Sequence, residues 1–239
     1  MLPARQRIAW RHCGDFVCRV ADNILRGEQW VSVAPQPRSM MLTLGLLLGC
    51  GSCYGALMGA YPFTWEETRP LQMLYSGLKV PLLLVLSFAL SVPSFYVANL
   101  LLGLGNDFGI AFRAVLATQA ALTITLFSLA PITTLFYISG ATYEQALMVN
   151  SLMFGISSLG VQPLLRRQYR SLIERNPWHR WTMRVWIVIY AFVGIQMGWV
   201  LRPFVGSPNS PTQFFRDEAW GNAYLVVWGL VKRVLGIDS

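Results

Sequence analysis

Two cysteines form the most recognisable candidate for redox or metal chemistry in this sequence. Cys50 and Cys53 stand in the stretch Gly-Cys-Gly-Ser-Cys, and a C-x-x-C pair can form a reversible disulfide or supply two zinc ligands. Zinc would need further ligands, but Cys13 and Cys18 lie outside the apolar run that holds this pair. A thioredoxin-like site would need a helix start beside a sheet. The sequence therefore favours small residues at a helix contact, with no metal and no cofactor.

Catalytic motifs are not recognisable in the chain. Its two histidines, His12 and His179, do not stand in a metal-binding pattern such as H-E-x-x-H. The sequence also has no G-x-S-x-G elbow and no phosphate-binding loop. Glu66 and Glu67 are adjacent, but neighbours in sequence need not face one substrate. We expect a protein that is not an enzyme, and keep an intramembrane lipid-modifying enzyme with an unusual site as a third alternative.

Four uncharged amides inside apolar runs could line a polar path through a membrane. They are Asn99, Gln119, Asn150 and Gln196. Pro93 and Pro131 interrupt two of the same runs, and broken helices with buried polar groups are typical of carriers and channels. The alternative is hydrogen bonding between helices. We favour it, because ion-coupled carriers usually have a titratable group deep inside a span, and none is expected here.

Glycines at intervals of four residues predict close packing of one helix. Gly51, Gly55 and Gly59 form one such series, and Gly45 and Gly49 form another pair. Small residues on one face let two helix backbones approach closely in a membrane. The contact could be a homodimer seam or a packing face within one bundle. Packing within the bundle is favoured because the chain itself supplies several helices.

These residues must be positioned by membrane-spanning helices. The 239 residues are 54% hydrophobic and 13% charged, with a mean hydropathy of +0.46, whereas soluble domains carry about 25% charge. Five windows are long and apolar enough to cross a bilayer: Met41–Tyr61, Val80–Leu102, Ala114–Ile138, Ala146–Leu165 and Val185–Leu201. Lipid cannot satisfy backbone polar groups, so each span must be helical. The sequence predicts an all-α polytopic bundle with five spans.

The distribution of basic residues predicts the orientation of this bundle. The net charge is +8, and the basic residues cluster in segments 1–39 and 165–184, which five spans would place on the same side. The positive-inside rule then predicts a cytoplasmic N-terminus and an outside C-terminus. Lys79, Arg113 and Arg202 stand at span edges, from where we expect their side chains to reach the headgroups. This clustering argues against nucleic-acid binding, which we do not expect.

The two ends of the chain flank the five-helix domain over residues 40–204. In segment 1–39, residues 15–29 are expected to form an amphipathic helix with Val20, Ile24 and Leu25 on its apolar stripe. That helix could dock a partner or, as we favour, lie on the membrane surface. In the outside tail, 205–239, residues 219–237 are expected to form an interfacial helix. The alternative is a sixth span, which would return the C-terminus to the cytoplasm.

A set of local features between residues 77 and 140 carries a family resemblance. They are Lys79-Val80-Pro81 opening a span, the Gly103-Leu104-Gly105 turn, Phe108 followed by Phe112-Arg113, and Ala130-Pro131 in an alanine-rich helix. With its five-span layout, the chain resembles the Yip-domain superfamily. The resemblance implies a cytoplasmic N-terminus and a short outside tail. Eukaryotic members look like trafficking factors that bind small GTPases, and many bacterial members have no assigned role; the resemblance assigns no functional residue here.

The sequence thus predicts a multi-pass integral membrane protein without assigning it a specific activity. We expect a non-catalytic scaffold or accessory subunit that contacts the lipid bilayer and either a membrane-protein partner or a second copy of itself. The alternative is a small permease or channel component. The preference for arginine over lysine favours a bacterial protein, and hence the inner membrane.

Overall fold

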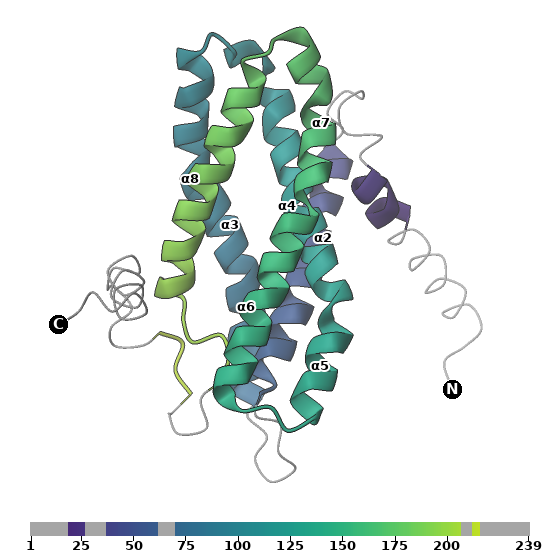
Figure 1. Ribbon diagram of the computed structural model, residues 1–239, viewed down its shortest axis with the longest axis vertical. Helices are drawn as coiled ribbons and strands as arrows, with labels where there is room; N and C mark the ends of the chain where they lie inside the picture. The colour runs from purple at the N-terminus through teal and green to yellow at the C-terminus, as the bar shows by residue number, and fades with distance from the viewer. Residues whose placement is uncertain (1–18, 27–36, 62–69, 207–211, 216–239) are drawn as a thin grey trace, which may run out of the picture.

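The computed structural model describes residues 19–26, 37–61, 70–206 and 212–215, and these form helices and turns with no strand (Figure 1). Five helical stretches are long and apolar enough to cross a membrane. They are Met40–Gly59, Pro70–Leu101, Gly105–Ile138, Tyr143–Arg175 and His179–Val200. The predicted all-α bundle of five spans is therefore confirmed.

The five spans contain seven α-helices because two spans are broken. The helices are α2 (Pro37–Gly59), α3 (Pro70–Leu101), α4 (Phe108–Ser128), α5 (Ala130–Ile138), α6 (Tyr143–Gly160), α7 (Gln162–Arg175) and α8 (His179–Val200), with a 3-10 turn, η1 (Gly105–Asp107), before α4. The third span breaks at Leu129 and the fourth at Val161. Pro131 and Pro163 stand in the first turns of α5 and α7, where a missing N–H is tolerated.

Two spans extend furthest beyond the apolar windows predicted from the sequence. Helix α3 begins at Pro70, so Pro81 lies inside it and does not open it as the sequence suggested. The fourth span continues through α7 to Arg175, past the predicted end at Leu165. Helix α7 is amphipathic, and it buries Tyr169 and Leu172 against the bundle. Hydropathy windows miss such ends because protein contacts there replace lipid.

Helix α4 lies at the centre of the bundle. Every residue from 114 to 123 is buried, and four of them are alanines, which allow neighbouring helices to approach from all sides. Helix α2 packs on α3 and α4, α8 packs on α3 and α7, and α6 packs on α4, α5 and α7. This arrangement leaves α6 and α8 on the same side of α4 (Figure 1).

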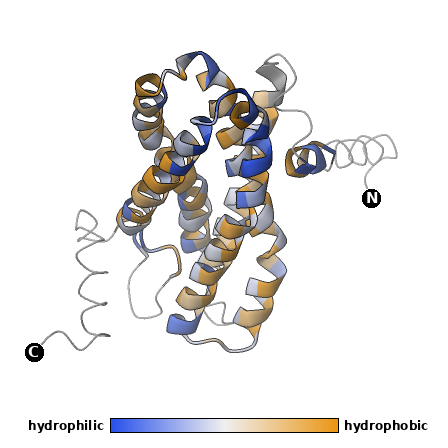
Figure 2. Ribbon diagram, turned by 45° about the horizontal axis from the view of Figure 1, so that its top comes forward, coloured by the Kyte–Doolittle hydropathy of each residue, from blue (hydrophilic) through white to orange (hydrophobic). Residues whose placement is uncertain are grey.

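The surface of the bundle is largely apolar. Figure 2 shows hydrophobic residues along most of the helices and hydrophilic residues gathered on α7 and at the turns. Large apolar side chains such as Leu74, Leu101 and Ile138 are 67%, 81% and 78% exposed. A water-soluble protein seldom exposes so much apolar surface. The chain is therefore a multi-pass membrane protein, with the hydrocarbon against these faces.

The described part of the N-terminal segment is a short helix over residues 19–26. Its Ile24 is fully buried and joins the same core cluster as Tyr54 and Leu126, while Leu25 is 45% exposed. This part of the expected amphipathic helix therefore docks on the bundle. Several features discussed from the sequence lie outside the described residues: the remainder of 15–29, His12, Cys13, Cys18, Glu66, Glu67 and residues 219–237. The sixth span, the alternative for residues 219–237, therefore stays a prediction.

Candidate ligand-binding crevice between α6 and α8

The glycines of α2 divide into two groups. An ideal Cβ on Gly59 would lie 2.6 Å from the Gln72 carbonyl oxygen, and one on Gly55 would lie closer still to that of Ser76. A Cβ on Gly51 would make ordinary contacts, 3.5 Å from Pro81 Cβ. Backbone contact with α3 at two glycines agrees with packing within the bundle.

The second glycine pair faces open space. A Cβ on Gly45 or on Gly49 would meet no atom within 4 Å among the described residues. Cys50 is half-buried and Cys53 is exposed, and both thiols are free. Within the described ranges, no group of three or more His, Cys, Asp or Glu side chains gathers as a metal site would require.

Asn150 connects three helices near the Gly140 end of the bundle. Its side chain is buried on α6. The Tyr54 hydroxyl on α2 donates to Asn150 Oδ1 over 3.2 Å, and Asn150 Nδ2 donates to the Tyr137 hydroxyl on α5 over 2.5 Å. The same nitrogen donates to the Ala146 carbonyl over 2.7 Å. This amide therefore makes the interhelical hydrogen bonds that the sequence favoured.

The other three amides of the predicted polar path lie in different surroundings. Gln119 on α4 accepts a hydrogen bond from the Tyr190 hydroxyl on α8 over 2.7 Å. Asn99 donates to the Phe95 carbonyl of its own helix over 2.8 Å, and Gln196 is half-buried on α8. Of the four amides predicted to line a polar path, Asn150 and Gln119 border the crevice that lies between α6 and α8.

Two adjoining cavities form this crevice. The end cavity, of about 570 Å³, is bordered by Tyr143 and Asn150 of α6 and by Arg202 just after α8. The middle cavity, of about 380 Å³, is bordered by residues of α3, α4, α6, α7 and α8, including Gln119 and Tyr190. The two share three lining residues, Leu83, Phe154 and Ile195. The two cavities therefore adjoin at these three side chains.

The crevice opens sideways, toward the hydrocarbon. Figure 1 shows α6 and α8 standing apart, with α3 and α4 behind them. Ile195 of α8 is 52% exposed and Leu147 of α6 is 40% exposed, and both line the end cavity. A molecule that enters between these side chains comes from the lipid, because both helices are membrane spans.

The polar groups of the middle cavity are uncharged. They are Ser87, Thr118, Gln119, Ser158, Gln162 and Tyr190. Ser87 is 1% exposed and its hydroxyl has no hydrogen-bond partner among the described residues. A buried polar group without a partner is rare in native structures and asks for an explanation. Ser87 is therefore a residue of the cavity lining whose buried hydroxyl still lacks a hydrogen-bond partner.

Lys79 does not reach the headgroups, which corrects the expectation from the sequence. Its side chain is fully buried, and Nζ donates to the Pro203 carbonyl over 2.7 Å. Its ammonium also lies 4.9 Å from the centre of the Phe214 ring. Ser76 and Gln72 of α3 donate to the next carbonyl, that of Phe204. The sequence predicted that Lys79 would reach the headgroups because it does not show that residues 203 and 204 cover this part of α3.

The segment of residues 201–206 therefore continues past the end of α8 along the first turns of α3. Val205 is 1% exposed, and a Cβ on Gly206 would lie 2.9 Å from Gln72 Cγ. Arg202 places its guanidinium carbon 3.4 Å from the centre of the Trp199 ring. Arg202, Pro203, Phe204 and Val205 form one wall of the end cavity. The hydrogen bonds from α3 thus hold that wall in place.

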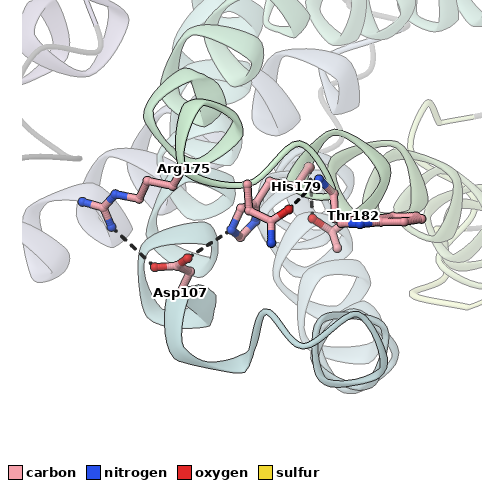
Figure 3. Close-up of polar contacts among 6 residues, drawn as sticks. Asp107, Arg175, His179 and Thr182 are labelled. Carbon is pink, nitrogen blue, oxygen red and sulfur yellow. Dashed lines mark hydrogen bonds and ion pairs between the residues drawn. The ribbon is translucent and has the colours of Figure 1, made fainter.

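A polar cluster lies at the Asp107 end of the bundle (Figure 3). His179 Nε2 lies 3.1 Å from Asp107 Oδ2, and Arg175 Nη1 lies 3.5 Å from Asp107 Oδ1. His179 is fully buried, and its carbonyl accepts a hydrogen bond from the Thr182 hydroxyl over 3.0 Å. The cluster connects the start of α4 to the turn between α7 and α8. Its members border neither cavity, so we read it as a structural contact.

Sequence reasoning missed Ser87 and the tyrosines that bind the amides. Serine is frequent in membrane helices, so Ser87 carries no signal on its own. The tyrosines did carry a sequence signal, because a tyrosine inside an apolar run needs a hydrogen-bond partner for its hydroxyl. Tyr54, Tyr137 and Tyr190 all find such a partner. Which amide each would meet depends on helix packing.

No protein-family model, curated protein or solved structure matches this chain. The resemblance to Yip-domain proteins therefore stays a prediction, and function must be argued from the crevice itself.

Proposed function

We propose that this protein is a non-catalytic lipid-binding membrane protein, which takes one amphipathic molecule from the bilayer into the crevice between α6 and α8. The observation that carries the proposal is the sideways opening of two adjoining cavities between two membrane spans. A space that opens into hydrocarbon is filled from hydrocarbon.

The lining of the crevice supports an amphipathic occupant. Leu83, Phe154 and Ile195 form the junction of the two cavities, and Leu122 and Ile187 continue this surface into the middle cavity. Ligand sites are typically apolar with a few placed polar groups. Acyl or isoprenoid chains would contact this apolar surface, while the amides and hydroxyls described above would hold a polar end.

The proposal gives a definite form to the scaffold or accessory role expected from the sequence. A scaffold of this kind would present its bound lipid to a partner protein, or use that lipid to recognise its membrane. We place it in a bacterial inner membrane with the Asp107 end in the cytoplasm. The arginines of α7 support this placement, because basic residues are retained on the cytoplasmic side.

Native mass spectrometry of protein extracted in mild detergent tests the proposal. We expect the wild type to carry one lipid that survives removal of detergent. Gly198 lines the end cavity, and a Cβ there would meet no atom within 4 Å, so Gly198→Leu should fill the crevice and remove the lipid. Gly155→Leu is the matched control, since Gly155 is exposed on α6 and lines neither cavity. Equal lipid content in both variants would contradict the proposal.

A small permease is the second candidate, favoured by the amides that border the two adjoining cavities. Asn150 borders the end cavity and Gln119 the middle cavity, so a polar solute could contact one and then the other. Flux into liposomes, compared between the wild type and Asn150→Leu and Gln119→Leu variants, tests this candidate. Unchanged flux in both variants would remove it.

A further inference from the structure

The middle cavity contains hydrogen-bonding groups on two facing helices. Ser87 projects from α3 with a buried hydroxyl that has no partner among the described residues. A Cβ on Gly194 of α8 would lie 3.9 Å from Ser87 Oγ, so the absence of a side chain at Gly194 leaves room beside that hydroxyl. One turn earlier on α8, Tyr190 donates to Gln119.

Each of these hydroxyls can make a further hydrogen bond. A serine hydroxyl has one donor and two acceptor sites, and a tyrosine hydroxyl that donates can still accept. A ligand alcohol could therefore donate to one oxygen and accept from Ser87. An acyl chain alone would leave the Ser87 hydroxyl buried and unpaired, which is unfavourable.

Charge distinguishes the two parts of the crevice. No Asp, Glu, Lys or Arg is among the residues that line the middle cavity, whereas Arg202 lines the end cavity. A charged headgroup in the middle cavity would lie in a low dielectric without an opposite charge, and this is strongly unfavourable. An uncharged polar group is held there without such a cost.

Resting on the proposed function, we infer that the middle cavity holds the uncharged polar end of a lipid, an alcohol such as that of a diacylglycerol. Its hydroxyl contacts Ser87 and the Tyr190–Gln119 pair. Its chains leave past Leu83 and Phe154, through the end cavity and the opening between α6 and α8. The alternative orientation, with an anionic headgroup beside Arg202 and a chain in the middle cavity, leaves Ser87 unpaired.

A competition between two lipids with identical chains tests this inference. Dioleoylglycerol and dioleoylphosphatidylglycerol are titrated together onto the purified full-length protein and followed by native mass spectrometry. We expect dioleoylglycerol to bind at least tenfold more tightly. Ser87→Ala should lower its affinity about three- to tenfold, the loss of one hydrogen bond. Ser157→Ala is the matched control and should leave the affinity unchanged. Ser157 is also buried, with a hydroxyl that has no partner among the described residues, but it lines neither cavity.

The remaining outcomes overturn the inference. Tighter binding of dioleoylphosphatidylglycerol, lost in Arg202→Gln but kept in Ser87→Ala, places the headgroup in the end cavity and leaves the proposed function standing. Equal dioleoylglycerol affinity in Ser87→Ala and wild type would mean that the Ser87 hydroxyl binds water and not the lipid alcohol. Failure of both lipids to bind also overturns the inference, and the proposed function falls with it only if the extracted protein carries no lipid. Unfolding midpoints of each variant show that the fold is retained.

Discussion

Two faces of the same bundle meet their neighbours in opposite ways. On one side of α3, Gly55 and Gly59 bring α2 into backbone contact. On the other side of the bundle, α6 and α8 stay apart around Leu83, Phe154 and Ile195. Lipid chains are as apolar as leucine, so hydrophobicity alone does not bring helices together in a membrane. Contact forms where small residues permit it, and elsewhere a space remains that lipid can enter.

The largest effect is expected where the glycine contact is broken. In Gly55→Leu the new side chain must displace the backbone of α3 at Ser76, because no flexible group can move aside. We expect a loss of about 3 kcal/mol or more in unfolding free energy, at or above the upper range for overpacking. Denaturant titration in mild detergent measures it.

Gly49→Leu is the control for this comparison, since a Cβ at Gly49 meets open space. We expect its unfolding free energy to stay within about 0.5 kcal/mol of the wild type, as for other surface substitutions. If Gly49→Leu were as destabilising as Gly55→Leu, the second glycine pair would also be a contact, and the homodimer seam would regain support.

A smaller effect is expected at Asn150, which connects the glycine-packed helix α2 with α6 beside the crevice. Asn150→Leu leaves the Tyr54 and Tyr137 hydroxyls without their amide partner. We expect a loss of about 1–2 kcal/mol, the range for hydrogen bonds between membrane helices. A double-mutant cycle with Tyr54→Phe measures the coupling. Additive losses would show that the hydrogen bond between the two does not contribute.

Lys79→Met should loosen one wall of the crevice while leaving the glycine contact intact. The substitution removes the hydrogen bond to the Pro203 carbonyl but keeps an unbranched apolar side chain. We expect a cost of about 1 kcal/mol, a typical net value for one hydrogen bond. Hydrogen exchange should rise in residues 201–206 and stay unchanged in α2. Faster exchange in both segments would contradict the separation of the two regions.

The smallest effect is expected at Ser87, and its sign is informative. Removing a buried hydroxyl that has no partner is neutral or slightly stabilising, by up to about 1 kcal/mol in lipid-free protein. Unfolding of delipidated wild type and Ser87→Ala measures this difference. A clear destabilisation would mean that the Ser87 hydroxyl contributes to the packing of α3, as Gly55 and Gly59 of α2 do.

The sequence predicted the spans because each must satisfy its backbone within hydrocarbon. It also predicted close packing at Gly55 and Gly59, since small residues at intervals of four lie on one helix face. It could not predict the break at Val161 or the start of α3 at Pro70. Those boundaries depend on protein contacts that replace lipid at the helix ends.

The crevice was largely hidden from sequence reasoning. Asn150 and Gln119 were selected for polarity, but their partners Tyr54 and Tyr190 lie 96 and 71 residues away. Ser87 resembles any other serine in a membrane helix until Gly194 is found opposite it. The burial of Lys79 follows from the packing of residues 201–206 against the first turns of α3, and no local sequence pattern signals that contact.

Photo-crosslinking in native membranes tests the central claim most directly. A photoreactive amino acid replaces Phe154, at the junction of the two cavities, or Leu152, which is 56% exposed on the same helix and lines neither. We predict that position 154 captures one lipid species far above its abundance in the membrane, whereas position 152 captures lipids in proportion to their abundance. The same lipid profile at both positions would contradict a binding crevice between α6 and α8.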